Sequence, residues 1–290
     1  MTMTRVAVFA SYDKDGIVHD YVLGYLKYLK EVSDKIIFIA DNYASEQEKN
    51  KIKDLVDFAE FLSHGEYDFG SYKRGFYYAK SKGWLDNANE LIFCNDSCFC
   101  VSSLTPIFEN MDKRVCDFWG MTKSHQINDH LQSYFIVFNA KVFNSKVFLN
   151  HLDSITHKDN FMDIVKCYEV PFTSKLVDYG FVCGEYIQFD DNCNPTIYPY
   201  KTYKKGLPLI KKKIFSEADY CKDSLWLVLM LLQKNKLFKE YVEKYFLACA
   251  FVVLGNICKR RLFNFIYHKK IGKDKIKIKI FNVTVLKIKK

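Results

Sequence analysis

Apolar and polar positions in the first 115 residues follow two alternating periods. Unbroken apolar runs at residues 5–10, 35–40 and 91–94 are typical of strands covered on both faces. Between them, residues 17–30 repeat apolar side chains at helical spacing. A capping box at Ser45 and Glu48 begins a second helix, and the glycine-rich stretch GEYDFGSYKRGF leads into a third. This alternation of strands and helices predicts a parallel, doubly wound sheet.

The pattern changes after residue 115 and predicts further elements of both kinds. Strands are expected at DFWGMT, QSYFIVFN and FVCGEYI. Helices are expected at 140–151 and 160–168, with Pro171 interrupting before a short helix that leads to Gly180. Apolar helical segments follow from Ser224, and the last residues alternate Lys and Ile as one strand or a small hairpin with a basic face.

These patterns predict three parts of the chain. Residues 1–215 form an α/β domain with a Rossmann-like sheet flanked by helices, 216–270 a helical extension that associates with a membrane surface, and 271–290 a basic tail. Neither apolar stretch of the extension reaches the roughly 18 residues that span a bilayer. Hydrophobic residues make up 49% of the chain, so a large core is expected.

The distribution of charge and the spacing of cysteines indicate where the protein is located and which surface it contacts. Residues 234–290 contain 16 Lys and Arg against three Asp and Glu, whereas the preceding part is mildly acidic. A basic tail on an acidic body favours an anionic membrane surface as partner and argues against nucleic acid. The ten cysteines show no zinc spacing, and no cleavable signal peptide is recognisable. We therefore expect a cytoplasmic protein, peripheral at the inner face of the membrane.

Polar residues follow the first three predicted strands. Asp13 comes after the first strand, Asp41 and Asn42 after the second, and Asn95 and Asp96 after the third. Because parallel strands share one carboxyl edge, these groups are expected to meet there, where open α/β sheets bind ligands. A divalent cation holding a diphosphate would relieve their repulsion. The alternative for Asn95 to Ser97 is an Asx-type turn.

Known nucleotide motifs are missing, but an ordered set of segments is recognisable. There is neither GxGxxG after the first strand nor GxxxxGK[ST]. YDFGSYKRG, LIFCNDS, DFWGMT, HLQSYFIVF, YEV and LPLIKKKIF follow one another between residues 67 and 215. In this the chain resembles the rhamnan synthesis protein F family of polysaccharide glycosyltransferases. The resemblance implies a GT-A-type fold, a nucleotide-sugar donor, a glycan or lipid-linked glycan acceptor, and a sugar such as rhamnose.

The same resemblance assigns candidate roles at the donor site. NDS takes the place of the family's metal-binding DxD motif, so Asp96 would hold Mn²⁺ or Mg²⁺ or the diphosphate, although only one of the three residues is a carboxylate. The candidate nucleotide-sugar contacts are Tyr12, Asp13, Asp41, Asn42, Asp68, Lys73, Asn95, Asp96 and Ser97. A solvated loop with a basic helix face is the alternative for Asp68 and Lys73.

Candidate residues for the acceptor side are fewer. By resemblance to inverting enzymes, Glu169 would be the catalytic base; alternatively it is a helix N-terminal carboxylate stabilised by the dipole. His130 and Gln132 could line the acceptor pocket or belong to the core, and Lys211 could meet phosphate or be one residue of a solvated charge run. A retaining transferase and a non-catalytic glycan-binding scaffold stay open as alternatives.

Overall fold

The chain forms two compact units. The computed structural model describes residues 3–189 and 194–215, isolated positions between 227 and 240, and residues 267–271, 275–280 and 283–289. The first unit comprises residues 1–195 with 206–209, and the second comprises 196–205 with 210–290. The helical extension predicted for residues 216–270 lies mostly outside the described residues.

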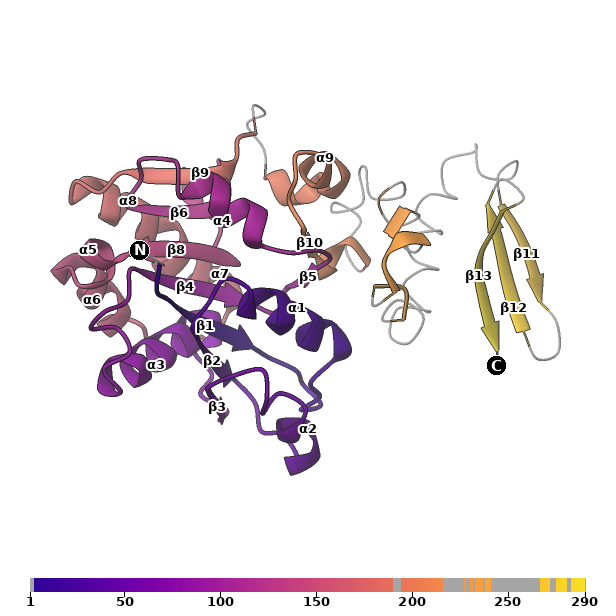
Figure 1. The fold of residues 1–290 in the computed structure, drawn as a ribbon, viewed down its shortest axis with the longest axis horizontal. Coiled ribbons are helices and arrows are strands. Elements are labelled where there is room, and N and C mark those ends of the chain that lie inside the picture. Colours follow the sequence, from indigo (N-terminus) through magenta and orange to yellow (C-terminus); the bar gives the residue numbers. More distant parts are fainter. Residues whose placement is uncertain are drawn as a thin grey trace. The chain divides into compact units, whose positions relative to one another are not determined.

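A mixed eight-stranded sheet forms the centre of the first unit (Figure 1). Its strands are β1 (Arg5–Ser11), β2 (Lys35–Ala40), β3 (Phe58–Phe61), β4 (Glu90–Asn95), β6 (Phe118–Ser124), β7 (His130–Leu131), β8 (Phe135–Asn139) and β9 (Cys183–Ile187). The order is β3-β2-β1-β4-β8-β6-β7, with β9 also paired to β6. Strands β3, β2, β1 and β4 run parallel, while β8 is antiparallel to both β4 and β6. The predicted α/β class is confirmed.

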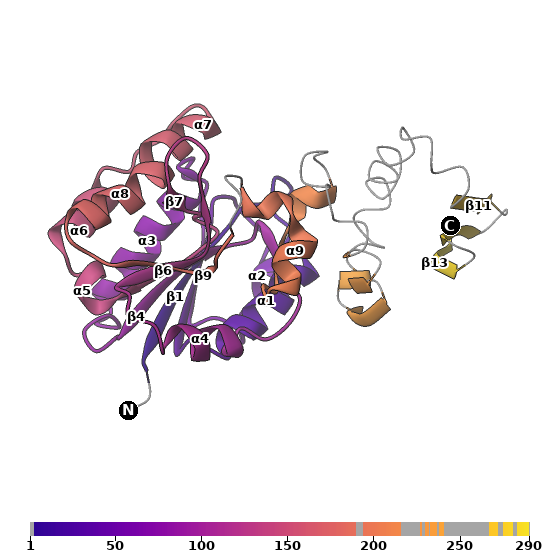
Figure 2. The same cartoon turned by 90° about the horizontal axis from the view of Figure 1, so that it is seen from above.

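Helices cover both faces of this sheet (Figure 2). They are α1 (Asp20–Lys30), α2 (Glu46–Asn50), α3 (Tyr67–Ser81), α4 (Thr105–Met111), α5 (Ala140–Phe143), α6 (Lys146–Asp153), α7 (Phe161–Ile164) and α8 (Val170–Asp178). Helices α3, α5, α6 and α8 lie on one face, and α1 and α4 lie on the other. A short strand, β5 (Cys98–Cys100), follows β4 outside the main sheet.

The face covered by α3 holds the larger aromatic core. Phe69, Tyr72 and Phe76 of α3 are buried there with apolar residues of β1, β2 and β4. The ring of Tyr72 stacks on Phe93 at 4.5 Å. Helix α3 approaches β1 so closely that a Cβ built on Gly75 would lie 2.3 Å from a methyl group of Val8. This tight contact fixes the position of α3 over the sheet.

The opposite face packs α1 and α4 on alternate strand residues. The ring of Phe9 on β1 contacts Tyr25 of α1 edge to face at 5.2 Å and stacks on Phe38 of β2 at 5.6 Å. Phe108 of α4 contacts Trp119 at 5.2 Å. Trp119 is 3% exposed. It is therefore a core residue, so it does not form a surface platform for a sugar ring.

Two helical predictions need correction. Residues 140–151, expected as one helix, form α5 and α6, because the Ser145 side chain accepts from Phe148 N–H and caps a new helix. Pro171, expected to interrupt, instead lies in the first turn of α8, directly after a turn of π-helix. A π-helix (Val165–Glu169) joins α7 to α8, so residues 161–178 form one continuous helical segment.

The described parts of the second unit include a helix and a separate sheet. Helix α9 spans Pro199–Lys204, and a 3₁₀ turn spans Lys212–Phe215. Between them, β10 spans Leu209–Lys211, of which Ile210 and Lys211 belong to this unit. Strands β11 (Tyr267–Ile271), β12 (Lys275–Ile280) and β13 (Val283–Lys289) form an antiparallel sheet in that order. Within the predicted tail, β12 and β13 pair as a hairpin, one of the two predicted forms, whereas β11 lies almost wholly in residues predicted as the helical extension. Within the described residues, every helix is too short or too polar to cross a bilayer.

Candidate functional site

The carboxyl ends of β1, β2 and β4 meet at one edge of the sheet, as predicted. Asp96 follows β4, and its Oδ2 accepts from the hydroxyl of Ser11 at 2.9 Å and from the backbone N–H of Tyr12 at 3.2 Å. The Tyr21 hydroxyl donates to the Asp96 carbonyl at 2.9 Å. Asp96 is 9% exposed, so it is held firmly against the end of β1. The Tyr12 side chain beside it is 58% exposed.

The loop after β1 is organised by Asp13 and Asn42. Asp13 Oδ1 accepts from the N–H groups of Asp15 and Ile17, and its Oδ2 lies 2.9 Å from Nε2 of His19. Burial by itself would raise the pKa of Asp13, but these donors outweigh it and hold that pKa below its usual value. Asn42 Oδ1 accepts from the Asp13 N–H at 2.9 Å. The two residues therefore shape the loop, and their predicted contact with a nucleoside stays a prediction.

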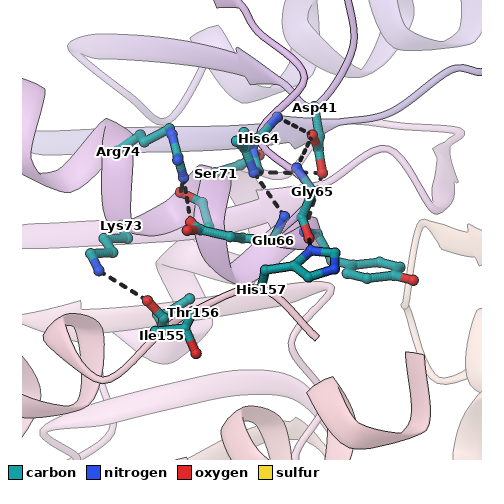
Figure 3. A network of polar contacts seen from close by, with 12 residues as sticks. Asp41, His64, Gly65, Glu66, Ser71, Lys73, Arg74, Ile155, Thr156 and His157 are labelled. Carbon is teal, nitrogen blue, oxygen red and sulfur yellow. Dashed lines mark hydrogen bonds and ion pairs between the residues drawn. The ribbon is translucent and has the colours of Figure 1, made fainter. Parts of the chain in front are cut away.

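Asp41 shapes a second loop at the same edge (Figure 3). Its Oδ1 accepts from His64 N–H at 2.6 Å and Gly65 N–H at 2.8 Å, and its Oδ2 accepts from Tyr67 N–H at 3.2 Å. Tyr67 has a positive φ of 57°, a strained conformation for a residue with a side chain. Asp41 thus stabilises the strained entry to α3. A direct role toward a nucleotide stays a prediction.

His64 is neutral in this loop. Its Nδ1 accepts from Glu66 N–H at 3.1 Å, so the proton is on Nε2, which lies 3.0 Å from the Ser71 hydroxyl. Burial lowers the pKa of His64 below its usual value, although Asp41 opposes this effect. The loop is therefore held together by hydrogen bonds to an uncharged ring.

The N-terminal turn of α3 contacts the end of β4. The amide of Asn95 donates to Asp68 Oδ2 at 2.7 Å. On its other side, Asn95 Oδ1 accepts from the N–H and the hydroxyl of Ser97. The Asx-type turn considered as the alternative is thus present, and it coexists with a polar link to α3. Asp68, Asn95 and Ser97 lie together at the predicted edge.

Tyr72 and Ser133 connect this edge to Glu169. The Tyr72 hydroxyl donates to the carbonyl of Ser133 at 2.8 Å. Ser133 in turn donates to Glu169 Oε1 through its N–H at 2.8 Å and its hydroxyl at 3.0 Å. Burial, followed by the negative charge of Asp68, raises the pKa of Tyr72 well above its usual value, so its phenol stays a donor. Ser133 precedes β8, whose first residue pairs with Cys94 beside the end of β4.

Glu169 lies at the junction of the π-helix and α8. It is the N-cap residue of α8, but its side chain makes no capping hydrogen bond. Instead, Oε1 is held by both donors of Ser133, whereas Oε2 has no hydrogen-bond or ion-pair partner among the described residues. The side chain is half-buried. One oxygen is therefore fixed and the other is available to a proton.

The other four predicted residues are Lys73, His130, Gln132 and Lys211. Lys73 projects from α3 to the end of α6, where its Nζ donates to the carbonyls of Ile155 at 3.0 Å and Asp153 at 3.4 Å. His130 and Gln132 are 5% and 8% exposed, and Gln132 bonds to Thr122 and Asn194. Lys211 belongs to the second unit. Its contact with phosphate stays a prediction.

Within the described residues, no group of three or more His, Cys, Asp or Glu side chains is placed to hold a metal ion. Asp96 has one oxygen occupied by Ser11 and Tyr12. One carboxylate is enough for a Mg²⁺ ion that arrives with substrate phosphates and keeps its waters. The residues therefore fit a cation brought by a diphosphate better than a resident metal centre.

Sequence reasoning missed Tyr72, Ser133 and Ser11. Tyr72 belongs to the apolar stripe of α3 and reads as core, and Ser133 lies in a connection 36 residues before Glu169. The polar residues within HLQSYFIVF were the available signal, because Ser133 directly precedes the apolar part of that segment.

The fold and this edge define an α/β protein with polar side chains gathered at the carboxyl ends of three parallel strands. Comparison with known sequences identifies the family. The chain belongs to the rhamnan synthesis protein F family, whose sequence profile matches residues 36–279. It is also 28% identical over 146 residues to the virulence protein VirA of Vibrio anguillarum, a region covering 50% of this chain and 46% of VirA. The chain thus spans about half the length of the curated relatives it matches.

Solved structures with a similar backbone are distant in sequence. The glycosyltransferase GlyE of Streptococcus pneumoniae TIGR4 matches with a TM-score of 0.44 and 14% identity, covering 83% of this chain and 64% of GlyE. Core-mannan synthase A of Aspergillus fumigatus, in its Mn/GDP form, matches with a TM-score of 0.34 and 11% identity, covering 59% and 69% of the two chains.

Proposed function

We propose that this protein is a glycosyltransferase of polysaccharide synthesis. It transfers a sugar, with rhamnose as the first candidate, from a nucleotide-sugar donor to a lipid-linked or surface glycan. Membership of the rhamnan synthesis protein F family supports the transferase class. One structural observation supports the chemistry: Tyr72 and Ser133 join the polar end of β4 to Glu169, and one oxygen of Glu169 is left without a partner in the described structure.

In the proposed reaction, Glu169 is the base and the anomeric carbon is inverted. Oε2 takes the proton of the acceptor hydroxyl while that oxygen bonds to the anomeric carbon. The bond from this carbon to the diphosphate breaks on the opposite side, and the nucleoside diphosphate leaves with the electron pair. Ser133 keeps the carboxylate oriented, because two donors fix Oε1.

The donor is proposed to lie at the ends of β1, β2 and β4. Asp96 would hold the diphosphate through Mn²⁺ or Mg²⁺, which neutralises charge on the leaving group when bound. Asn95, Ser97 and Asp68 form the adjacent polar surface. Tyr12, Asp13, Asp41 and Asn42 line the loops on the nucleoside side.

The donor site is tested by thermal shift of the intact chain with a panel of sugar nucleotides, with and without Mn²⁺. We expect a metal-dependent shift with one nucleotide class and its loss in Asp96→Ala. Asp129→Ala is a control, because Asp129 is an exposed carboxylate whose only hydrogen-bond or ion-pair partner among the described residues is His125. A flat panel at saturating ligand would contradict the donor site and favour the glycan-binding scaffold. A donor shift with full transfer by Glu169→Gln would instead favour a retaining enzyme.

The basic tail is proposed to hold the enzyme at the inner face of the membrane. Residues 234–290 contain 16 Lys and Arg against three Asp and Glu, and the three strands β11, β12 and β13 lie in this region. Each basic residue near an anionic surface contributes about 1 kcal/mol. Removal of residues 267–290 should abolish binding to phosphatidylserine-containing vesicles while donor binding persists. Unchanged vesicle binding would contradict this role.

A further inference from the structure

A pocket unrelated to the donor edge opens beside the outermost strand of the sheet. It has a volume of about 390 Å³ and lies between β3 and α3. Its lining residues are Phe58, Glu60, Glu66, Lys73, Arg74, Tyr77 and Tyr78. Strand β3 pairs only with β2 within the main sheet, so this side of the unit is an edge.

The apolar wall of the pocket is aromatic. The rings of Phe58 and Tyr78 stack with centroids 3.5 Å apart, and Trp84 packs edge to face on Tyr78 at 5.6 Å. Phe58, Tyr77 and Tyr78 are all partly exposed. Partly exposed aromatic rings are suited to the C–H groups of a sugar, because the contact buries apolar surface and leaves the hydroxyls at the rim.

The charges of the pocket cancel. Arg74 bonds to Glu66 Oε2 at 2.5 Å and also donates to the Gly70 carbonyl. The Lys73 ammonium is directed to the end of α6, where it donates to two backbone carbonyls. Glu60 has no hydrogen-bond or ion-pair partner among the described residues and can accept from hydroxyl groups. A phosphate would meet the carboxylate of Glu60, unpaired among the described residues, and an Arg74 cation already paired with Glu66, whereas a neutral polyhydroxylated ligand meets acceptors, donors and aromatic rings together.

We propose that this pocket is a binding subsite for a neutral saccharide. The subsite takes one or two rings of a glycan chain, which pack against the partly exposed rings of Phe58, Tyr77 and Tyr78 and donate hydroxyl hydrogen bonds to Glu60 and Glu66. The assignment of that glycan as the growing acceptor chain rests on the proposed function. The saccharide binding itself rests only on the pocket.

Helix α3 presents the two sites on opposite sides. Asp68 and Tyr72, four residues apart, face the polar end of β4, whereas Arg74, Tyr77 and Tyr78 face the pocket. A helix with its side chains is about 10–12 Å wide, so the two sites are roughly one helix diameter apart. The loop at residues 64–67 links the two sites. Asp41 at the donor edge accepts from the N–H groups of Gly65 and Tyr67, the neighbours of Glu66 in the pocket wall (Figure 3).

The side-chain conformation of Glu66 requires a glycine at position 70. A Cβ built on Gly70 would lie 2.3 Å from Glu66 Cβ and 2.8 Å from its Oε2. Only glycine at this position lets the Glu66 side chain cross the first turn of α3 and reach Arg74. The Glu66 side of the pocket wall therefore depends on both the loop at residues 64–67 and helix α3.

The test is saturation-transfer NMR and calorimetry on the full chain, with a rhamnose trisaccharide as the probe. We expect binding at millimolar concentration, about tenfold weaker in Tyr78→Leu and about fivefold weaker in Glu60→Ala. The matched controls are Tyr43→Leu, at a tyrosine that is 68% exposed, and Glu109→Ala, at an exposed carboxylate of α4. Both controls should bind the trisaccharide as the unmodified chain does.

Two outcomes would overturn the proposal. One is no saturation transfer to the trisaccharide from the folded chain; the other is equal affinity in Glu60→Ala, Tyr78→Leu and the controls. Glu60→Ala guards against a folding artefact, because Glu60 makes no contact on which the described fold depends. The sugar-nucleotide shift is measured on the same variants and should be unchanged. Failure of the subsite is thereby separated from failure of the donor site, which only Asp96→Ala tests.

Discussion

Asp41 and Glu169 are two carboxylates that the fold uses in different ways. Asp41 is 8% exposed, and both of its oxygens accept backbone N–H groups of the loop at residues 64–67. Glu169 is half-buried, and only Oε1 is occupied, by the two donors of Ser133. A carboxylate whose oxygens are all bonded stabilises structure, whereas one with a fixed oxygen and an available oxygen is oriented for proton transfer. The difference is the reason for proposing Glu169, and not Asp41, as the base.

The largest effect is expected from Glu169→Gln. The amide keeps the shape but cannot take a proton, so sugar transfer should fall by about 10²–10⁴-fold while donor binding is retained. Transfer is measured with radiolabelled donor, and stability is measured by urea unfolding. Asp163→Asn is the control, because Asp163 lies on the same helical segment. Transfer above a tenth of the unmodified rate would remove Glu169 from the role of base.

For Asp41→Asn we expect the opposite result, a large loss of stability and a smaller loss of transfer. One side-chain oxygen becomes an amide that faces the N–H donors of the loop, and the strained Tyr67 loses support. We expect the free energy of unfolding to fall by about 2–3 kcal/mol. Urea unfolding gives this value, and transfer per folded molecule should fall far less than in Glu169→Gln. A variant of normal stability that lacks donor binding would instead place Asp41 at the nucleotide.

His151 differs from both carboxylates, because it is a buried titratable group with one ring nitrogen lacking a hydrogen-bond partner among the described residues. Its ring stacks on Phe172 at 4.0 Å, and Nε2 has no partner among the described residues. Burial, followed by the charge of Lys175, lowers the pKa of His151 to about 3. Because the unfolded side chain titrates near pH 6.5, its contribution to stability is complete above pH 6.5 and declines as the pH falls toward 3.

At pH 5 this decline amounts to about 2 kcal/mol relative to neutral pH. His151→Phe keeps the stacking and cannot be protonated, so its stability should fall less between pH 7 and 5. Urea unfolding at both values measures the difference, which cancels contributions from the carboxylates common to both proteins. Identical pH profiles would mean that His151 is protonated in the folded state without cost.

Ser133→Ala should give the smallest effect and sharpens the assignment of Glu169. The substitution removes the hydroxyl donor at 3.0 Å and keeps the backbone donor at 2.8 Å. We expect the turnover number for transfer to fall by about tenfold, with the acceptor KM nearly unchanged, because the substitution loosens the carboxylate without touching the acceptor. Ser174→Ala on α8 is a control, since the Pro171 carbonyl is its hydroxyl's only hydrogen-bond partner among the described residues. An unchanged turnover number would indicate that the Ser133 hydroxyl does not position the base.

The shared edge was predictable because it depends on local patterns. Unbroken apolar runs identified β1, β2 and β4, and parallel pairing brings their carboxyl ends together whatever the loops contain. Asp13, Asp41 and Asp96 were therefore placed correctly at that edge. How their oxygens are used was not predictable, since the donors to Asp41 come from a loop more than 20 residues away.

The route from the edge to Glu169 required tertiary information. Tyr72 follows the helical stripe of the core, and nothing in its local sequence shows that its hydroxyl reaches Ser133, 61 residues later. Lys73 illustrates the opposite case: its charge suggested a phosphate ligand, but the end of α6 provides two carbonyl acceptors within reach. Side-chain direction on α3, which composition does not encode, decides both outcomes.

The five-residue π-helix before α8 has a consequence for how this family can vary. A wide turn holds one more residue than an α-helical turn of the same rise, so it acts as an insertion absorbed within the helix. Deleting one residue from Val165–Tyr168 would therefore restore a regular α-helix and keep the segments on either side in nearly the same orientation. Inserting a further residue would rotate Glu169 relative to the preceding segment by about 100°. The stretch should thus tolerate a one-residue deletion better than a one-residue insertion, because only the insertion turns the Glu169 carboxylate away from Ser133.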